Sequence, residues 1–531
     1  MDRYSLDKPP APDTTKQMAF WRWLIVDEIG MVSARLLAQM DQRIRSAKPA
    51  ADEWKIDPKT NRPRPFGGIN VLFTGDFAQL PSPEGGGIAE IPASLRPRGD
   101  HAPPPDPLIQ HGQELFWGGA VQGVTELVER ERCKDEWWNE VVDELREGYL
   151  SDKNHKYLHG RPVEGCTLSP EERASRQRVI DGPDDPRLQD MKFVTGTVIV
   201  ANNDAKYQIN KDRAAGYARA AETPLRWSVA KDKALSKVLQ TQACDKDAKL
   251  RWLQYHDMDT EGLCGMLPLA VGMPVALTQH VDRSEKALLK GRVAHVHSWD
   301  WPENDQQPRL VYVKFKDADW TLDGSTEKGL YPIEPVKRTW KLDKGRKNPV
   351  LAVSRTQLPL VPAFAITAHS SQGKTLSAVL LDFNIHRRTH VSYGTVVASR
   401  VRSREDVLIL RAFPAWLYQR GPPEGVAKLL QRLRGELNLD VFREATWPSA
   451  PCEACRRAKP LNLFADAQWQ RARANRPATC LACEKKKRAD RSFQPGKRKK
   501  YTARPANWRR SRTPSREPSS RKRTPTASGN A

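Results

Sequence analysis

Short apolar runs alternate with a helix-like pattern in the first ninety residues of the chain. The runs WLIVDE (23–28) and INVLFTGD (69–76) are rich in residues that favour strands, and each ends in carboxylates. Strand–helix–strand alternation predicts a parallel α/β sheet in this region. The stretch between the runs, SARLLAQMDQRIRSA, places four apolar side chains on one helical face: Leu36, Leu37, Met40 and Ile44.

The pattern changes several times further along the chain. Residues 114–150 predict a strand followed by a helix, and residues 192–215 predict a strand, a turn and a helix. Residues 220–262 are charged and helix-prone with weak periodicity, so we interpret them as an insertion. From 266 to about 360, short β runs separated by turns predict a small β barrel. Residues 361–413 return to α/β character.

Charge is distributed unevenly over the 531 residues. The formal net charge is +23, and residues 484–531 carry +14 of it, with 17 Lys/Arg against 3 Asp/Glu. Such a balance favours nucleic acid as a partner, because neutralisation of phosphates by Lys and Arg dominates that kind of affinity. The alternative to nucleic-acid binding is a soluble protein with a charged, solvated tail. This tail contains too few apolar residues to form a core, so we expect it to be disordered.

Four of the eight cysteines form two C-x₂-C pairs that are separated by 24 residues. Two thiolate pairs at this spacing can complete a tetrahedral zinc site, and four cysteines leave no open coordination position, so the zinc would be structural. Redox-active or merely structural cysteines are the alternative. The predicted metal ligands are Cys452, Cys455, Cys480 and Cys483.

The chain contains no apolar run of about 18 residues, which a membrane span needs. Its first residues also lack the apolar core of a signal peptide. We therefore expect an intracellular protein. Lys/Arg clusters at 485–488, 497–500 and 521–523 are typical of nuclear-localisation or nucleic-acid-binding segments and suggest the nucleus, with an inert tail as the alternative.

The first two strand ends carry the most specific motif. A strand ending in Asp27 and Glu28 is typical of nucleoside triphosphatases, in which the Asp holds Mg²⁺ and the Glu orients the attacking water. The second run continues as FTGDFAQLPSP, and together the two stretches resemble motifs II and III of the Pif-type (petite integration frequency) DNA helicases of superfamily 1. The resemblance implies that Gln79 senses the γ-phosphate of ATP and couples it to single-stranded DNA.

Further motifs follow in the order of that family, and the resemblance covers about residues 18–413. LVERERC resembles motif IV and VVASRVRS resembles motif VI, which implies that Arg132 and Arg400 contact the γ-phosphate. Preorganised cations around a transferring phosphoryl group make physical sense, because charge develops there. Residues 266–296 resemble the family strand that leads into an SH3-like insertion. One departure is Tyr393, which lies out of register with motif VI in an altered strand.

The string AHSSQGKT (368–375) allows two interpretations. A phosphate-binding loop needs glycines and a following helix, but this string offers only Gly373 and precedes the strand-like run LSAVLLDF. As motif V it fits the family, and Lys374 is then incidental. The resemblance implies that Gln372 and Gly373 relay to the nucleotide and that three residues of the loop contact the nucleic acid: His369, Ser371 and Thr375.

Taken together, the sequence predicts an α/β fold with two RecA-like P-loop NTPase domains, an SH3-like β insertion, a Cys₄ zinc module that resembles Stc-type zinc domains, and a disordered basic tail. The resemblance implies an ATP-dependent 5′–3′ DNA helicase that uses ATP and Mg²⁺, with Zn²⁺ in the module. Its partner would be single-stranded or forked DNA, with RNA or chromatin proteins as candidates for the module, and its roles would be DNA repair, recombination and telomere maintenance.

Nothing in the first twenty residues is Gly-rich, whereas the family places a phosphate loop before motif II. We therefore expect little or no ATPase activity from this chain, with a partial gene model or a non-catalytic nucleic-acid or chromatin adaptor as alternatives. The expected segments are a disordered N-terminus (1–17), a truncated RecA-like domain 1 (18–126), the start of RecA-like domain 2 with the charged insertion (127–265), the SH3-like insertion (266–360), the rest of domain 2 (361–413), a helix and linker (414–450), the zinc module (451–484) and the tail (485–531).

Overall fold

The computed structural model of this protein divides the chain into two compact units, Met1–Trp447 and Pro448–Ala531. The basic tail and residues 1–11 lie outside the described part of the chain, so the predictions made for them stay predictions. Residues 12–17, which we expected to be disordered, instead belong to helix α1 (Pro12–Ala19). The structure describes residues 12–48, 55–59, 61–95, 106–236, 246–346, 348–439, 449–460, 464–465, 467–468, 471 and 476–484.

The N-terminal lobe is built on two parallel strands, β1 (Trp23–Val26) and β2 (Asn70–Phe73), as the sequence predicts. Helix α2 (Ala34–Ala47) connects them, and the Ser33 hydroxyl caps it by accepting the N–H of Leu36 at 3.2 Å. Helix α3 (Pro107–Trp117) packs against α2. These helices cover one face of the strand pair and bury its inward side chains in a common core.

The expected apolar face of α2 is rotated slightly in the structure. Leu37 and Ile44 are buried as predicted, but Leu36 and Met40 are only partly buried, and Ala34 and Asp41 take up core positions instead. Asp41 is fully buried. Its carboxylate can be buried because it accepts a hydrogen bond from the backbone N–H of Phe66 at 2.6 Å. A polar residue therefore occupies a core position that hydrophobic periodicity could not reveal.

The opposite face of the same strand pair carries large apolar side chains that remain exposed. Trp23 is 68% exposed, Ile25 66% and Leu72 50%. Parallel sheets are usually covered on both faces, and none of the described residues forms a second layer over these side chains. The strand expected within residues 114–150 is also missing from the described structure, because residues 121–130 have no regular secondary structure between α3 and α4 (Glu136–Arg146).

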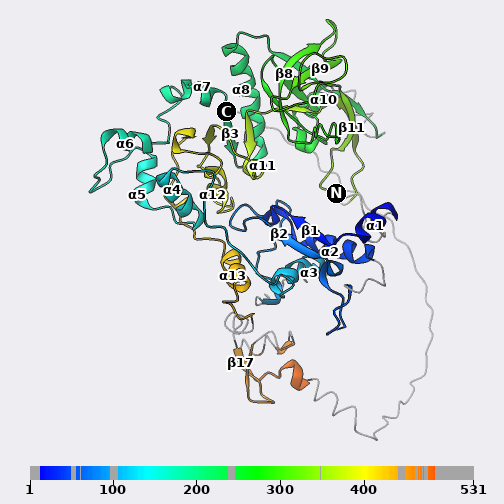
Figure 1. The fold of residues 1–531 in the computed structure, drawn as a ribbon, viewed down its shortest axis with the longest axis vertical. Coiled ribbons are helices and arrows are strands. Elements are labelled where there is room, and N and C mark those ends of the chain that lie inside the picture. Colours follow the sequence, from blue (N-terminus) through cyan, green and yellow to red (C-terminus); the bar gives the residue numbers. More distant parts are fainter. Residues whose placement is uncertain are drawn as a thin grey trace, which may run out of the picture. The chain divides into compact units, whose positions relative to one another are not determined.

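The C-terminal lobe contains a four-stranded parallel sheet with strand order β14-β3-β15-β16. Figure 1 labels its strand β3 near helix α8. Residues 192–215 form their predicted strand and helix, and helix α8 packs against β3 and β14. The lobe's own core buries side chains from α4, α12 and this sheet. The strands are β3 (Thr197–Val200), β14 (Ala365–Thr367), β15 (Val379–Leu381) and β16 (Val407–Ile409), and the helices are α5 (Asp152–Leu158), α6 (Pro170–Arg176), α7 (Met191–Val194), α8 (Asn203–Ala220), α11 (Ala368–Ser371) and α12 (Tyr393–Ala398).

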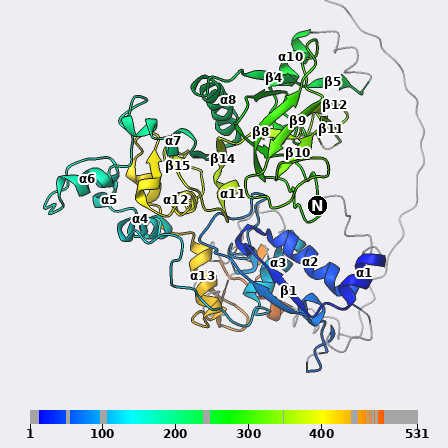
Figure 2. The ribbon, with the colours of Figure 1, turned by 45° about the horizontal axis from the view of Figure 1, so that its top comes forward.

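Residues 266–360 form short antiparallel strands, as the sequence predicts, whereas their closure into a small β barrel stays a prediction (Figure 2). The largest sheet of this β unit has five strands in the order β10-β9-β8-β7-β13, and three more strands pair as β11-β12-β5. Its SH3-like character stays a prediction. The strands are β6 (Met266–Leu269), β7 (Pro274–Leu277), β8 (Val293–Asp300), β9 (Leu310–Lys314), β10 (Leu330–Ile333), β11 (Val336–Lys341), β12 (Ala352–Gln357) and β13 (Leu360–Pro362).

The helix-prone interpretation of residues 220–262 is wrong in part. Strands β4 (Arg226–Val229) and β5 (Lys231–Ala234) lie inside this segment and pair with β6 and β12 of the β unit. The buried Arg355 forms an ion pair with Asp232 of β5 at 2.6 Å, and this long-range contact holds the charged strand in place. Among the described residues of this segment, α10 (Lys246–Gln254) is the α-helix that agrees with the expectation.

Helix α13 (Glu424–Leu433) follows the C-terminal lobe in sequence, yet its Leu429 is buried in the core of the N-terminal lobe against α3. The second unit contains the strand pair β17 (Ser449–Pro451) and β18 (Ala458–Pro460). Within the described part of the chain, no helix has the length and apolar character needed to cross a membrane.

Candidate nucleotide-binding site

Asp27 and Glu28 directly follow β1, at the carboxyl end of the parallel strand pair. The Thr74 hydroxyl, just after β2, donates a hydrogen bond to Asp27 Oδ1 at 2.5 Å, and the Glu28 N–H donates to the same oxygen at 2.9 Å. These two donors lower the pKa of Asp27, with Thr74 the larger cause. Asp27 is therefore an exposed carboxylate that stays ionised, which is the kind of oxygen ligand that Mg²⁺ prefers.

Glu28 has a left-handed backbone conformation, with φ 52° and ψ 46°. Its backbone lies directly against Gly75, where an added Cβ would sit 2.8 Å from the backbone nitrogen of Ile29 and 3.2 Å from the Cα of Glu28. Gly75 also has a φ of +140°, which other residues rarely adopt. A glycine at this position is what lets the two strand ends approach so closely.

The loop after β2 brings Gln79 next to the same edge of the sheet. Gln79 Nε2 lies 3.5 Å from Asp76, while its Oε1 is buried with no hydrogen-bond partner. Two guanidinium nitrogens of Arg146, which lies on α4, donate hydrogen bonds to the Asp76 carboxylate. Nη1 donates to Oδ2, and Nη2 donates to Oδ1 at 2.9 Å. Burial alone would raise the pKa of Asp76, but the Arg146 guanidinium holds it below its usual value. This bidentate ion pair joins the N-terminal lobe to the C-terminal lobe.

Two arginines approach this edge from the C-terminal lobe. Arg132 donates to Thr375 Oγ1 at 2.8 Å and to the carbonyl of Ser399 at 2.9 Å. Arg400 is only 2% exposed and donates to the carbonyls of Val396 and Ser371 and to the Ser399 hydroxyl. Burial, followed by the repulsion of Arg132, lowers the pKa of Arg400 to about 10. Neither arginine has an acidic partner within ion-pair distance among the described residues.

The loop after β14 crosses from the C-terminal lobe to the carboxylates. Gln372 Nε2 donates to Glu28 Oε2 at 3.1 Å, and a Cβ placed on Gly373 would lie 3.6 Å from Glu28 Oε1. Gln372 Oε1, like Gln79 Oε1, is buried without a partner. His369 Nε2 lies 3.2 Å from the carbonyl oxygen of Pro81 in the loop of the N-terminal lobe. The predicted motif V residues therefore contact motif II and III residues directly.

One predicted nucleic-acid contact, Ser371, is buried in the structure, and its role stays a prediction. Ser371 is fully buried, and its hydroxyl donates to the carbonyl of Ala368 at 2.8 Å, so its side chain is not available to a ligand in this conformation. Thr375 is exposed, although Arg132 occupies its hydroxyl. The segment after the loop forms β15 rather than a helix, which agrees with the motif V interpretation of the AHSSQGKT string.

The segment before Arg400 also differs from expectation. We interpreted the residues around Tyr393 as an altered strand, but they form α12, a short helix in which every residue is buried. The Tyr393 hydroxyl donates to the carbonyls of Asp382 and Ile199, which anchors this helix on the parallel sheet. Arg400 then follows the helix by two residues, and the helix fixes the position of its backbone.

Sequence reasoning missed two residues that shape the site. Thr74 orients Asp27, and its only signal was its place directly before the Gly75–Asp76 pair. Arg146 lies on a helix of mixed charge, and no motif distinguished it from its neighbours. Its role as the partner of Asp76 depends on a contact between residues that are 70 positions apart.

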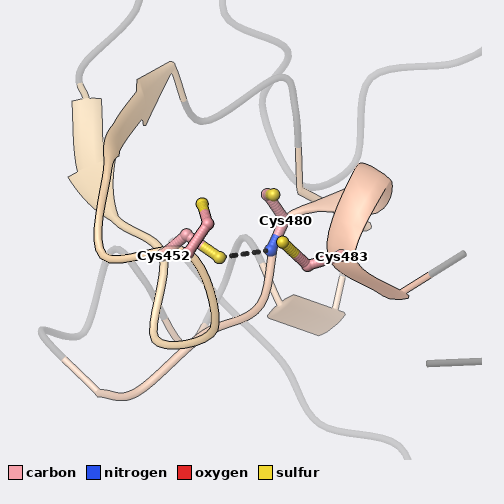
Figure 3. Close-up of side chains that lie close together, drawn as sticks. Cys452, Cys480 and Cys483 are labelled. Carbon is pink, nitrogen blue, oxygen red and sulfur yellow. Dashed lines mark hydrogen bonds between the residues drawn. The ribbon is translucent and has the colours of Figure 1, made fainter. Parts of the chain in front are cut away.

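The four predicted metal ligands come together in the second unit, and Figure 3 labels three of them, Cys452, Cys480 and Cys483. The sulfur atoms of Cys452, Cys455, Cys480 and Cys483 all lie within 4.8 Å of one another. The N–H of Cys480 donates to Cys452 Sγ at 3.3 Å. Although burial opposes it, this and other backbone N–H groups lower the pKa of the Cys452 thiol to about 6. Four cysteine sulfurs in one cluster fit a metal ion with tetrahedral thiolate coordination.

The residues of the cleft fit a nucleoside triphosphate with a divalent cation. An ionised carboxylate is held ready at Asp27, two arginines lack acidic partners, and two glutamine oxygens are buried without hydrogen bonds. Buried polar atoms without partners are rare in folded proteins and mark places where a ligand or water supplies the missing bond. No glycine-rich phosphate loop is found among the described residues of the two lobes.

Comparisons with known proteins agree with this geometry. The sequence model of the PIF1-like helicase family matches residues 8–94. The ATP-dependent DNA helicase PIF1 of Emericella nidulans is 22% identical over 436 residues, which cover 77% of this chain and 51% of that protein. The ATP-dependent DNA helicase PIF1 of Danio rerio is 24% identical over 400 residues, which cover 75% of this chain and 48% of that protein. The chain thus spans about half the length of these curated relatives.

A crystal structure of Pif1 helicase from Candida albicans resembles this fold with a TM-score of 0.50 and 18% identity, over 80% of this chain and 79% of the other. At this identity, the likeness supports the two-domain α/β helicase fold. The family model falls on the segment that carries Asp27, Glu28 and Gln79, and the relatives extend the match through both lobes. Residues 8–94 thus match the PIF1-like helicase family, and the chain is similar to PIF1 helicases over about three quarters of its length.

Proposed function

We propose that this protein is an ATP-dependent DNA helicase of the Pif type, which moves 5′ to 3′ along single-stranded or forked DNA. The observation that carries the proposal is the hydrogen bond from Gln372 to Glu28. This hydrogen bond joins two parts of the site. The resemblance assigns the loop of Gln372 to nucleic-acid binding and Glu28 to activation of the attacking water. ATP hydrolysis and DNA binding would therefore be coupled through one contact between the lobes.

Each residue of the cleft has a distinct role in this proposal. Asp27 would hold Mg²⁺, which neutralises phosphate charge when it is bound, and Thr74 would keep the carboxylate oriented. Glu28 would position the attacking water. Arg132 and Arg400 would stabilise the charge on the γ-phosphate from the opposite lobe, because neither has an acidic partner to neutralise it. Gln79 and Gln372 would accept hydrogen bonds from the attacking water through their unpaired amide oxygens.

Nucleotide binding by the purified chain tests the cleft directly. We expect a fluorescent ATP analogue to bind in the presence of Mg²⁺, and we expect Asp27→Asn and Arg400→Ala each to weaken that binding by about tenfold, the loss of roughly 1.4 kcal/mol. Lys337→Ala, an exposed substitution on β11, is the matched control and should leave binding unchanged. Equal affinity of all four proteins would contradict the proposal.

We also propose that hydrolysis by the 531-residue chain is weak, because no phosphate loop is found among its described residues. The measurement is ATP turnover with and without single-stranded DNA. Hydrolysis that is stimulated by DNA and abolished by Glu28→Gln would show instead that the chain is fully active.

For the cysteine cluster we propose Zn²⁺ in a structural role, since all four ligands come from the protein. Metal analysis of the purified chain should find one zinc per molecule, and Cys480→Ser combined with Cys483→Ser should lose it. Retention of the zinc by this double variant would contradict the assignment.

A second candidate function is that of a nucleic-acid or chromatin adaptor that acts through the second unit. Residues 448–531 hold 23 Lys/Arg against 5 Asp/Glu, so most of the net positive charge of the chain lies in this unit. The same basic clusters support a nuclear location. If the second unit alone binds nucleic acid, salt-dependent DNA affinity will survive Asp27→Asn and be lost in the double cysteine variant; the helicase proposal expects binding that responds to nucleotide.

A further inference from the structure

Asp76 organises the short turn that carries Gln79 at the edge of the cleft. The backbone carbonyl of Asp76 accepts the N–H of Gln79 at 3.1 Å, and its Oδ1 accepts the N–H of Ala78 at 2.9 Å. Its Oδ2 lies 3.5 Å from Gln79 Nε2. A Cβ added to Gly30 would lie 2.9 Å from the Asp76 carbonyl oxygen, so the turn after Glu28 packs closely on the same residue. Asp76 thus holds the backbone of Gln79 and lies within reach of its amide group.

Arg146 ties this turn to the C-terminal lobe. Its Nη1 and Nη2 donate to the two carboxylate oxygens of Asp76, with Nη2 to Oδ1 at 2.9 Å. Paired hydrogen bonds between a guanidinium and a carboxylate fix the relative orientation of the two groups as well as stabilising their contact. The side chains of Arg146 and Asp76 are 36% and 25% exposed, so the pair can separate without leaving either charge fully buried.

The helix that carries Arg146 is fixed to the segment that carries Arg400. Helices α4 and α12 pack against each other in the core of the C-terminal lobe. Trp138 of α4 is fully buried, and its indole Nε1 donates to the carbonyl of Ala398, the last residue of α12, at 3.0 Å. Arg400 follows α12 by two residues. Arg146 and Arg400 therefore belong to one packed body, and a contact made by one positions the other.

Arg400 lies within electrostatic range of two carboxylates of the N-terminal lobe. Burial lowers the pKa of Arg400, and the negative charges of Glu28 and Asp76 act in the opposite direction. An effect of this kind requires proximity, because the interaction between charges weakens with distance. Asp76 thus binds Arg146 directly and attracts Arg400 at longer range.

We propose that Asp76 and Arg146 form a positioning pair that sets how Gln79 and Arg400 approach each other at the γ-phosphate of the nucleotide. The inference rests on the proposed function, which places Gln79 at the attacking water and Arg400 at the γ-phosphate. Neither member of the pair touches the nucleotide, and each acts through the group that it holds. Because only a nucleoside triphosphate has a phosphate at this place, the pair increases the affinity for ATP and leaves that for ADP unchanged.

The experiment measures the affinity of the full chain for fluorescent analogues of ATP and ADP, each titrated with Mg²⁺. We expect Arg146→Met, which removes the charge of a long side chain, to reduce the preference for ATP about tenfold at unchanged ADP affinity. Asp76→Asn keeps an oxygen for the N–H of Ala78 and should reduce the preference to a similar extent. The double variant should lose no more than either single variant, because the two residues act as one pair.

Arg130→Met is the matched control for the loss of an arginine ion pair. Arg130 pairs with Asp143 of the same helix α4, and neither residue belongs to the N-terminal lobe, so this variant should keep the wild-type preference. Arg146→Lys keeps the charge but not the paired hydrogen bonds, and it should lose part of the preference. Circular dichroism and the thermal unfolding midpoint check the fold of each variant, and Arg146→Lys replaces Arg146→Met if the latter does not fold.

The outcomes separate this inference from the function on which it rests. If the wild-type chain binds both analogues and a folded Arg146→Met keeps their affinity ratio, or loses affinity for both equally, the positioning pair is overturned while the nucleotide site stands. Equal affinity of the wild-type chain for ATP and ADP, or additive losses in the double variant, would overturn the pair as well. If the wild-type chain binds neither analogue, the proposed function and the inference are both overturned. A selective and non-additive loss of the preference for ATP supports the pair.

Discussion

Single hydrogen bonds decide the chemistry available at the end of β1. Asp27 is exposed, yet its carboxylate is held by Thr74 and by the backbone of Glu28. A carboxylate that is oriented before the metal arrives loses less freedom on binding it. Thr74 is therefore a positioning residue for Asp27.

The first prediction concerns this hydroxyl. Replacing it in Thr74→Val should raise the Mg²⁺ concentration needed for half-maximal nucleotide binding by roughly 3- to 10-fold, the effect of one lost hydrogen bond. Thr74→Ser keeps the donor and should behave like the wild-type chain. Fluorescent nucleotide binding at a series of Mg²⁺ concentrations measures the shift, and a Thr74→Val curve that overlies the wild-type curve would exclude the role.

The second prediction concerns Asp135, which caps α4. Its carboxylate accepts hydrogen bonds from Nε and Nη2 of Arg404, each at 2.6 Å. Burial alone would raise the pKa of Asp135, but Arg404 and two backbone N–H groups lower it to about 2. Asp135→Asn should lower the free energy of unfolding by about 1–3 kcal/mol at pH 7. The exposed pair of Arg130 and Asp143 is the control, and Asp143→Asn should cost less than about 1 kcal/mol.

The pH dependence of this effect has a definite sign. Because the pKa of Asp135 is lower in the folded protein than in the unfolded chain, its stabilisation is present in full above about pH 4. It is lost as the pH falls through the folded value of about 2. Urea unfolding at pH 7, 5 and 3 should show a constant difference between wild type and Asp135→Asn at the first two values and a smaller one at the third.

At the scale of the elements, the N-terminal lobe depends on one close contact between helices. A Cβ at Gly112 of α3 would lie 1.8 Å from the carbonyl oxygen of Ala34 at the start of α2. Gly112→Ala must push the helices apart and should cost about 3 kcal/mol or more. Gly216 in α8 has open space around it, so Gly216→Ala should stabilise the protein by about 0.5–1 kcal/mol. Urea unfolding of both variants checks this contrast, and a neutral Gly112→Ala would contradict the observed helix packing.

The two faces of the β1–β2 pair are a second contrast at this scale. Ile25 is 66% exposed on one face, whereas Val26 is 8% exposed in the core of the other. Ile25→Lys should change the unfolding free energy by less than about 0.5 kcal/mol and reduce the binding of a hydrophobic dye. Val26→Lys should destabilise the lobe by several kcal/mol, because it buries an unpaired charge. Equal effects of the two substitutions would show that the exposed face is covered in solution.

At the scale of the whole molecule, the chain consists of two units with different determinants of stability. The first unit has large apolar cores, while the described residues of the second include few buried apolar side chains beside its cysteine cluster. Small domains of this kind depend on a metal for their stability. Calorimetry of the full chain should show that Cys480→Ser removes only the transition of the second unit. A shift in the main transition would contradict the division into independent units.

The sequence by itself determined the features that depend on local pattern. Strands ending in Asp27–Glu28 and Gly75–Asp76, the β unit after residue 266 and the paired cysteines were all predicted correctly, because each follows from short-range periodicity or spacing. The order of the motifs also indicated the resemblance to the family whose model matches residues 8–94, since each short motif can be recognised without knowing where the others lie in space.

Tertiary structure decided everything that depends on residues far apart in the chain. The charged strands β4 and β5 are strands because partners in the β unit supply their hydrogen bonds, and the helical residues of α12 are fixed by burial against the sheet. Arg146 gained a role only through Asp76, and the burial of Ser371 could not be foreseen from its place in the motif. The sequence thus determined which groups the protein possesses, whereas long-range packing decided which of them share the cleft, because burial and pairing are properties of the folded chain.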